Sequence, residues 1–318
     1  MAYALTVSVF VLCVGALLFS SARSRRAESG RKGGETAERA GGCSARSEEN
    51  AAPAPQNEEK PAFFEPHQER VPADGGRNDI AAPAPPSFSV PPAAPGATIL
   101  LVIDDAGQSA ERTKRYAELP FPLTIAVLPR LPQARVCAEA VLAGGKELIL
   151  HQPMQAMDAR LDPGDGAVRV GMTKEQIQSV VRENLRELGG GVKGMNNHEG
   201  SLITADFEKI GYVLDVCREQ GVYFLDSRTT SESQAVNAAF ARGMQIWEKA
   251  GPYIDNEVSR ERMLGRIYET LDYANRHGRA VVIAHVDKSA HILPRLLEEL
   301  YPHLKEAGYT FATPSGLE

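Results

Sequence analysis

Ionisable and amide side chains repeatedly follow short apolar runs in this 318-residue sequence. They are Asp104-Asp105, His151, Asn196-Asn197-His198, Asp226-Ser227-Arg228, Asp255-Asn256 and His285. Histidine and carboxylate are the ligands that divalent transition metals take in hydrolases, which also keep a position open for water. A separate carboxylate must deprotonate that water, and a separate acid must protonate the leaving group. The residue types in this set are therefore those of metal-assisted hydrolysis.

Each of these residues also has a structural explanation, because an aspartate at the end of a strand often caps a helix or closes a turn. Asp104 and Asp105 are adjacent, so their side chains diverge near a strand end and can take different tasks. His151, His198 and His285 follow different apolar runs. The rim of a barrel would bring the three histidines together, although their spacing alone does not prove that they meet.

Seven short, continuously apolar runs predict the strands that must position these side chains. Continuous rather than alternating apolar residues are typical of strands buried on both faces, as in a parallel sheet. The functional groups of such folds gather at the carboxyl edge of the sheet. The runs are 97–103, 123–128, 147–150, 192–195, 222–225, 280–284 and 309–312.

Helical patterns fall between these runs. Thr173 and Gln176 form a capping box that opens a helix ended by Gly189, and further helices are expected over 207–220 and 259–278. Alternation of strand and helix predicts a parallel α/β sheet or barrel. About seven strands within 97–318 favour a closed or nearly closed barrel.

The first 96 residues differ in composition from the rest. Residues 1–22 carry no charged side chain and are long enough to span a bilayer, which predicts a transmembrane anchor. The alternative is a signal segment cleaved near Ser20–Ala22, although a basic n-region is missing. Residues 23–96 are rich in proline, alanine and mixed charge, and are expected to form a disordered tether. A docking site for a proline-binding partner is the alternative for this segment.

The charge and cysteine content exclude several classes of protein. A formal net charge of -6 argues against nucleic acid as a partner. Four cysteines without a C-x-x-C pair exclude a zinc ribbon and a disulfide scaffold.

Several motifs, taken together and in order, resemble the divergent polysaccharide deacetylase family. They are ILLVIDDAG, ELILHQPM, GMNNHEGSLIT, FLDSRTT and a late IDN, and the resemblance covers roughly residues 97–314. It implies a distorted (β/α) barrel of about seven parallel strands over 97–318. It also implies metal-dependent removal of acetyl groups from carbohydrate of the cell envelope. The alternative is a non-catalytic module on the same barrel that binds envelope glycan or protein.

The resemblance also assigns roles residue by residue. It implies Asp104 as general base, Asp105, His151 and His198 as ligands of a divalent metal with Zn²⁺ the leading candidate, and His285 as general acid. We separately expect Asn196, Asn197, Asp226 and Arg228 to bind substrate, with a simple turn as the alternative for the two asparagines.

The sequence departs from the family pattern at four places. Ala284 and Val286 flank His285 where a glycine and a proline are usual, and Glu199 stands where the family has an apolar residue. Gln152 follows His151, and 248–251 lacks the usual Arg-Asp pair. These changes bear on the acid and on substrate binding more than on the metal ligands.

Two opposing arguments bear on the position of the domain relative to the membrane. Arg23, Arg25 and Arg26 lie directly after the apolar run and favour a cytoplasmic position for the rest of the chain. The long tether, and the extracellular substrate that the resemblance implies, favour the outside. We expect the domain on the outer, periplasmic face of the cytoplasmic membrane, or exported after signal cleavage.

Overall fold

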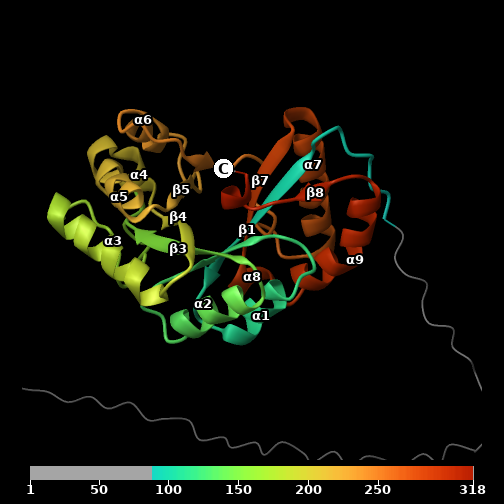
Figure 1. Cartoon of the computed structure of the whole chain (residues 1–318), viewed down its shortest axis with the longest axis horizontal. Helices are drawn as coiled ribbons and strands as arrows, with labels where there is room; N and C mark the ends of the chain where they lie inside the picture. The colour runs from blue at the N-terminus through green and yellow to red at the C-terminus, as the bar shows by residue number, and fades with distance from the viewer. Residues whose placement is uncertain (1–87, 318) are drawn as a thin grey trace, which may run out of the picture. The chain divides into compact units, whose positions relative to one another are not determined.

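The computed structural model of the chain describes residues 88–317 (Figure 1). The expected anchor at 1–22 and most of the expected tether at 23–96 lie outside this range. None of the helices within 88–317 has the length and apolar character needed to cross a bilayer.

A parallel sheet with the strand order β6-β5-β4-β3-β2-β1-β7 forms the centre of the described domain. All seven strands expected from the sequence are present, and β6 is an additional one. The strands are β1 (Thr98–Ala106), β2 (Thr124–Val127), β3 (Glu147–Met154), β4 (Val192–Glu199), β5 (Tyr223–Asp226), β6 (Trp247–Glu248), β7 (Arg279–His285) and β8 (Thr310–Phe311), which pairs with the start of β1.

The sheet is curled into a half-barrel. The segment 247–254 contacts both β5 and β7. Trp247 pairs with Leu225 of β5, and Tyr253 forms a bridge to Ile283 of β7. The expected distorted barrel is thus confirmed. The additional strand β6 was not expected from the sequence, because only two of its residues pair and no apolar run marks them.

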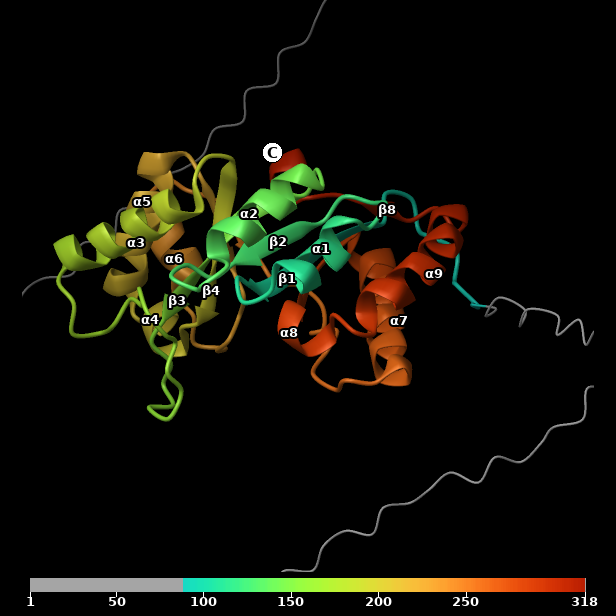
Figure 2. The ribbon, with the colours of Figure 1, turned by 90° about the horizontal axis from the view of Figure 1, so that it is seen from below.

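Helices surround the outside of the curled sheet (Figures 1 and 2). The capping box at Thr173 and Gln176 is present, and Gly189, Gly221 and Gly278 end their helices as expected. The helices are α1 (Ala110–Ala117), α2 (Ala134–Ala143), α3 (Lys174–Leu188), α4 (Ser201–Ala205), α5 (Phe207–Gln220), α6 (Ala235–Phe240), α7 (Arg260–His277), α8 (Val286–Ser289) and α9 (Leu293–Glu306), followed by a 3₁₀ turn at Pro314–Gly316.

Alternate residues of the strands face the two sides of the sheet, and this alternation positions the site. Along β1, Ile99, Leu101 and Ile103 belong to the large core beneath the helices, whereas Leu100 and Val102 belong to a small core inside the half-barrel. Ile149, Leu225 and Ile283 share that inner core. Because side chains alternate with a period of two, the next inner positions are Asp104, His151, Ser227 and His285.

Both ends of the described chain lie near the amino ends of the strands. The Ala93 N–H donates to the Ala307 carbonyl at 2.8 Å, and the Ala94 N–H donates to Asn275 Oδ1 at 2.7 Å. Near the other end, the Ser315 N–H donates to Glu147 Oε2 at 3.3 Å. The packed domain therefore includes residues before the expected boundary at 97.

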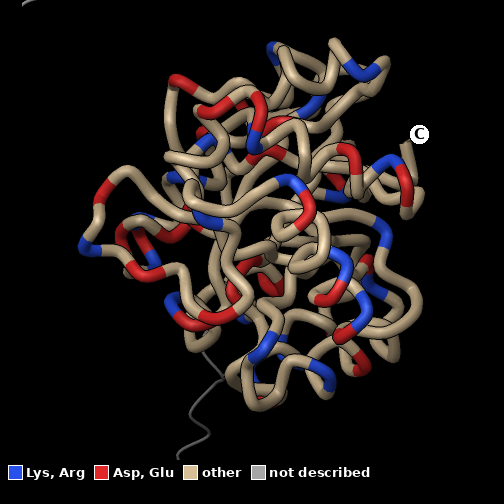
Figure 3. Tube along the Cα trace, turned by 90° about the vertical axis from the view of Figure 1, so that its left-hand side faces the viewer, with Lys and Arg blue, Asp and Glu red and all other residues tan. Residues whose placement is uncertain are grey.

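Lys and Arg alternate with Asp and Glu along the described chain, without a continuous basic stripe in the side view of Figure 3. Many of these charges form exposed ion pairs, for example Arg276 with Asp272 at 2.6 Å.

Candidate metal centre

The backbone between Asp104 and Asp105 brings both carboxylates to one cavity. Regular alternation would send Asp105 to the outer face of β1. The pairing of β1 with β2 shifts register between Ile103 and Ala106, and Asp105 has a φ of 63°. This left-handed conformation is uncommon outside glycine, asparagine and aspartate, and such outliers cluster at functional sites. Asp105 is thereby turned back toward the side that Asp104 already faces.

His151 and His198 lie inside strands rather than after them, which corrects the expectation from the sequence. β3 and β4 continue pairing beyond their apolar runs, with His151 opposite Asn196 and Pro153 opposite His198. Because these positions hold polar residues, the sequence suggested that the strands had already ended there. They are strand residues because their backbones remain paired while their side chains enter the cavity.

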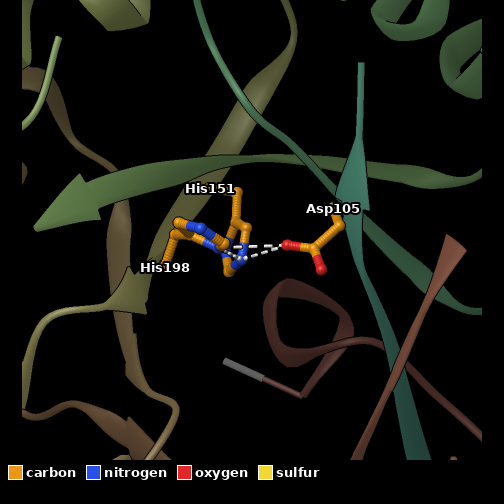
Figure 4. A group of neighbouring side chains, drawn as sticks. All are labelled: Asp105, His151 and His198. Atoms are coloured by element: carbon orange, nitrogen blue, oxygen red, sulfur yellow. Dashed lines mark hydrogen bonds and ion pairs between the residues drawn. The ribbon is translucent and has the colours of Figure 1, made fainter. Parts of the chain in front are cut away.

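The Asp105, His151 and His198 side chains converge on one point (Figure 4). Asp105 Oδ1 lies 3.2 Å from His151 Nε2 and 3.0 Å from His198 Nδ1, and the two nitrogens are 3.1 Å apart. Ligands held 2.0–2.2 Å from a tetrahedral ion are about 3.3 Å from one another. The three atoms therefore have the separation that a small divalent ion requires.

The hydrogen bonds around this group also fit an ion. His151 Nδ1 lies 2.7 Å from Asn196 Oδ1, which can only accept, so Nδ1 carries the proton and the neutral ring has a lone pair at Nε2. Asp105 Oδ1 is buried and has no hydrogen-bond partner among the described residues. Acceptor atoms facing one another without a donor are what a metal site needs.

Without an ion, the pKa values of Asp105 and His151 also indicate that this site favours positive charge. Burial opposes the charged form of Asp105, but its contacts with His151 and His198 hold its pKa well below the usual range. Burial likewise opposes a charged His151, but Asp104 and Asp105 raise the pKa of His151 to about 9.

Asp104 lines the same cavity, and its side chain is almost fully buried. Its Oδ1 accepts a 2.8 Å hydrogen bond from Asn196 Nδ2, whereas Oδ2 is 3.8 Å from His151 Nε2, too far for a hydrogen bond. Burial raises the pKa of Asp104, while His151 and His285 oppose this shift. The carboxylate thus has one oxygen fixed and the other available to the cavity.

His285 is held by Asp255, a pairing that the sequence analysis missed. Asp255 Oδ1 is 2.9 Å from His285 Nδ1, and Oδ2 accepts the His285 backbone N–H at 2.6 Å. Burial lowers the pKa of His285, but the hydrogen bond and charge of Asp255 outweigh it, so the pKa is raised. The ring stacks at 5.9 Å on Tyr253, and its Nε2 has no hydrogen bond to any residue of 88–317. The sequence marked Asp255 only as a residue after an apolar run.

A cavity of about 390 Å³ contains these groups, a size usual for small-molecule sites. Its lining includes Asn256, which the sequence marks after an apolar run, and four residues that the sequence did not single out as site residues: Glu199, Thr229, Tyr253 and Lys288. No pattern in the sequence marks these four, because they come from turns or from segments outside the apolar runs. The expected residues on its wall are Asp104, Asp105, His151, Asn197, His198 and His285.

Asn196, Asp226 and Arg228 are not on the cavity wall. The Asp226 carboxylate accepts from the Arg228 N–H at 2.8 Å and from Ser233 Oγ at 2.6 Å, so it organises the turn after β5. Arg228 pairs with Glu248 at 3.2 Å. Substrate contacts of these residues stay predictions.

Asn197 lines the cavity and also closes a turn, so it fits both alternatives. Its Oδ1 accepts from the Ser227 N–H at 2.9 Å, and its Nδ2 donates to the Glu199 carbonyl at 2.7 Å.

The geometry agrees with a family-level comparison of the sequence. The model of the divergent polysaccharide deacetylase family matches residues 101–317. This chain belongs to the divergent polysaccharide deacetylase family. The expected family is thus confirmed, and its match includes every residue of the metal centre.

Two bacterial proteins described as uncharacterized are similar to the chain in sequence. The chain is 28% identical over 187 residues to an uncharacterized protein of Haemophilus influenzae, covering 59% of this chain and 66% of that protein. It is 26% identical over 207 residues to the uncharacterized protein YibQ of Escherichia coli, covering 65% of this chain and 64% of YibQ. The chain thus spans about two thirds of the length of these relatives.

A solved structure supports the fold. An uncharacterized protein of Agrobacterium tumefaciens is similar with a TM-score of 0.62 and 18% sequence identity. The similarity covers 74% of this chain and 92% of that one. The similarity shows that these two chains share a fold.

Proposed function

We propose that the domain is a metal-dependent deacetylase acting on acetylated carbohydrate of the cell envelope. One observation carries this proposal: three ligand atoms within 3.2 Å of one another share a cavity with a buried carboxylate and a histidine fixed by an aspartate. Metal-assisted hydrolysis needs these three components, and the family to which the chain belongs is named for deacetylation.

In the proposed reaction, the chain's own residues hold and move the protons. Asp105 Oδ1, His151 Nε2 and His198 Nδ1 would hold the ion, with Zn²⁺ the leading candidate. Such an ion, when bound, would supply Lewis-acid chemistry: it would polarise the acetyl carbonyl and make water a better nucleophile. Asp104 accepts the proton of the attacking water at Oδ2. His285 gives a proton from Nε2 to the departing sugar oxygen or nitrogen as the bond to the acetyl carbon breaks and acetate forms.

The environment of Glu199 is a further reason to propose a carbohydrate substrate. Its Oε2 is buried and lacks a hydrogen-bond partner among the described residues, although Glu199 lines the cavity. Its φ of 51° places it in the left-handed region, where few residues are found without a functional reason. A carboxylate oxygen without a donor is suited to accept a hydrogen bond from a sugar hydroxyl.

The test combines metal analysis with product analysis on the purified full chain. We expect close to one equivalent of a divalent ion per chain, and acetate release from at least one acetylated glycan in a broad panel. Protein that stays metal-free after incubation with Zn²⁺, Co²⁺, Mn²⁺ and Ni²⁺ would contradict the proposal. Bound metal without acetate release would favour a glycan-binding module on the same barrel.

We further propose that residues 1–22 anchor the chain in the cytoplasmic membrane and that 23–96 tether the domain on its outer side. The uncharged run of 1–22 and the proline-rich composition of 23–96 support this arrangement. Envelope carbohydrate outside the membrane is then within reach of the tethered domain.

A further inference from the structure

Asn196 connects two groups that have separate tasks in the proposed reaction. Its side chain is fully buried, and both ends of its amide are used. Oδ1 lies 2.7 Å from His151 Nδ1, and Nδ2 lies 2.8 Å from Asp104 Oδ1. A weaker contact of 3.3 Å joins Nδ2 to Ser227 Oγ.

The orientation of this amide is set by its neighbours. An ionised carboxylate can only accept hydrogen bonds, so the NH₂ group must face Asp104. The carbonyl oxygen then faces His151 and can only accept from the Nδ1–H. A flipped amide would point its oxygen at the Asp104 carboxylate and lose that hydrogen bond. The amide therefore fixes the tautomer that leaves His151 Nε2 free for a metal.

We infer that Asn196 is a positioning residue that couples the metal ligand His151 to the base Asp104. This inference rests on the proposed function, because the roles of the two partners come from it. The carbonyl holds the His151 ring in place and in the metal-binding tautomer. The amide group donates to Asp104 Oδ1, which fixes the carboxylate and leaves Oδ2 for water.

This role differs from the substrate contact expected from the sequence, and the structure gives the reason. Asn196 faces the inside of the half-barrel, directly opposite His151 in the β3–β4 pairing. The His151 ring and the Asp104 carboxylate lie on the cavity wall, whereas Asn196 does not. Its neighbour Asn197 reaches the cavity instead.

Asparagine is the side chain best suited to this position. Aspartate would accept from His151 but would set a second carboxylate against Asp104, and like charges at such a distance cannot both stay ionised. Leucine has the same branching at Cγ but offers no hydrogen bond. The two substitutions therefore separate the two arms of the amide.

The first experiment tests the arm to His151 with Asn196→Leu. We expect the Kd for Co²⁺, measured by calorimetry on the full chain, to rise about 10- to 100-fold, the usual effect of removing a partner of a ligating histidine. The absorption spectrum of the Co²⁺ protein should also change as the ring loses its orientation. An unchanged Kd and spectrum would overturn this arm.

Asn184→Leu is the matched control. Asn184 is also fully buried and also uses both ends of its amide, donating to Gln152 Oε1 at 2.9 Å and accepting from Arg130 Nε at 3.1 Å. It lies outside the metal centre, so this variant should lose stability while the Co²⁺ affinity stays that of the wild type. An equal loss of affinity in both variants would show a general structural effect and overturn the inference.

The second experiment tests the arm to Asp104 with Asn196→Asp. Because the acceptor for His151 is retained, Co²⁺ binding should be at least as tight as in the wild type. Turnover should fall by about 10²–10⁴-fold with KM unchanged, because the base now shares a proton with a second carboxylate. Wild-type turnover in this variant would overturn the coupling to Asp104.

A metal-free measurement separates this inference from the proposed function. In ¹⁵N-histidine-labelled protein without metal, the His151 Nδ1–H should give a slowly exchanging proton signal that Asn196→Leu abolishes and Asn196→Asp keeps. If the wild type releases no acetate, the proposed function fails while this result still stands. If Asn196→Leu keeps the protected proton, the inference fails whatever the activity.

Discussion

Two adjacent aspartates can serve different purposes because the backbone changes direction between them. Asp104 continues the inner row of β1, and Asp105 joins it through a left-handed residue at the irregular pairing with β2. Only Asp105 has an oxygen within 3.2 Å of both histidines. The two carboxylates are therefore distinguishable by substitution.

The first prediction compares Asp104→Asn with Asp105→Asn. Asp104→Asn should keep the metal but lose about 10²–10⁴-fold in kcat, because a positioned base contributes this much. Asp105→Asn should lose metal, because an amide is a poor ligand for the ion. Metal content by elemental analysis and acetate release measure the two effects. Loss of metal from Asp104→Asn would instead make Asp104 a ligand.

The second prediction concerns the pH dependence set by Asp255. His285 must be protonated to act as an acid, and Asp255 raises its pKa, so activity persists to higher pH before it falls. Asp255→Asn keeps an acceptor for the ring but removes the charge. The high-pH limb of the kcat/KM profile should therefore move to lower pH.

The control for this change is Asp272→Asn, which removes an exposed carboxylate paired with Arg276 on α7. Its pH profile should equal that of the wild type. A high-pH limb that stays in place in Asp255→Asn would show that His285 is not the acid.

At the scale of residues, the resemblance named three side chains that lie together in the structure, but the contacts that support them were not predicted. Asp105, His151 and His198 do converge. The pairing of Asp255 with His285 and the bridge made by Asn196 depend on which strands are neighbours. That information is not contained in the spacing of the residues.

At the scale of elements, the half-barrel depends on close packing inside the curled sheet. Gly194 of β4 lies against Tyr223 of β5, where an added Cβ would be 2.5 Å from the ring. The ring cannot easily move, because its hydroxyl donates to Glu147 Oε1 at 2.6 Å, which also accepts from Thr124 at 3.0 Å. Position 194 therefore has no room for a side chain.

The third prediction is that Gly194→Ala lowers the free energy of unfolding by about 1–3 kcal/mol, the usual cost of overpacking a core. Urea unfolding followed by circular dichroism measures it. Gly171→Ala is the control, because a Cβ there meets no atom within 4 Å and should change stability little. Equal midpoints for the two variants would contradict the packing argument.

The elements themselves were largely predictable, because continuous apolar runs and capping residues determine them locally. The exceptions have a common cause. The carboxyl halves of β3 and β4 are polar and β6 is only two residues long, so tertiary pairing rather than composition makes them strands. That Leu100, Val102 and Asp104 face the inside of the half-barrel can be inferred from the sequence only if a barrel is already assumed.

At the scale of the whole molecule, the fourth prediction concerns the side of the membrane on which the domain lies. A fusion at residue 318 to a reporter that is active only after export should be active, because the proposed substrate lies outside and positive residues bias topology without determining it alone. A matched fusion to a reporter that works only in the cytoplasm should be silent. The reverse result would place the domain inside.

The chain ends of the described domain and the cavity lie at opposite ends of the strands. Residues 93–94 are bonded to Ala307 and Asn275, and Ser315 is bonded to Glu147, all at the amino ends of the strands. The cavity lies at the carboxyl ends, about 20 Å further along β1, since Asp104 is six residues beyond Thr98 at about 3.3 Å per residue. The mouth is therefore the face farthest from both points of attachment. A domain immobilised on a bead or fused to a bulky protein through either end would still offer its mouth to a large polymer.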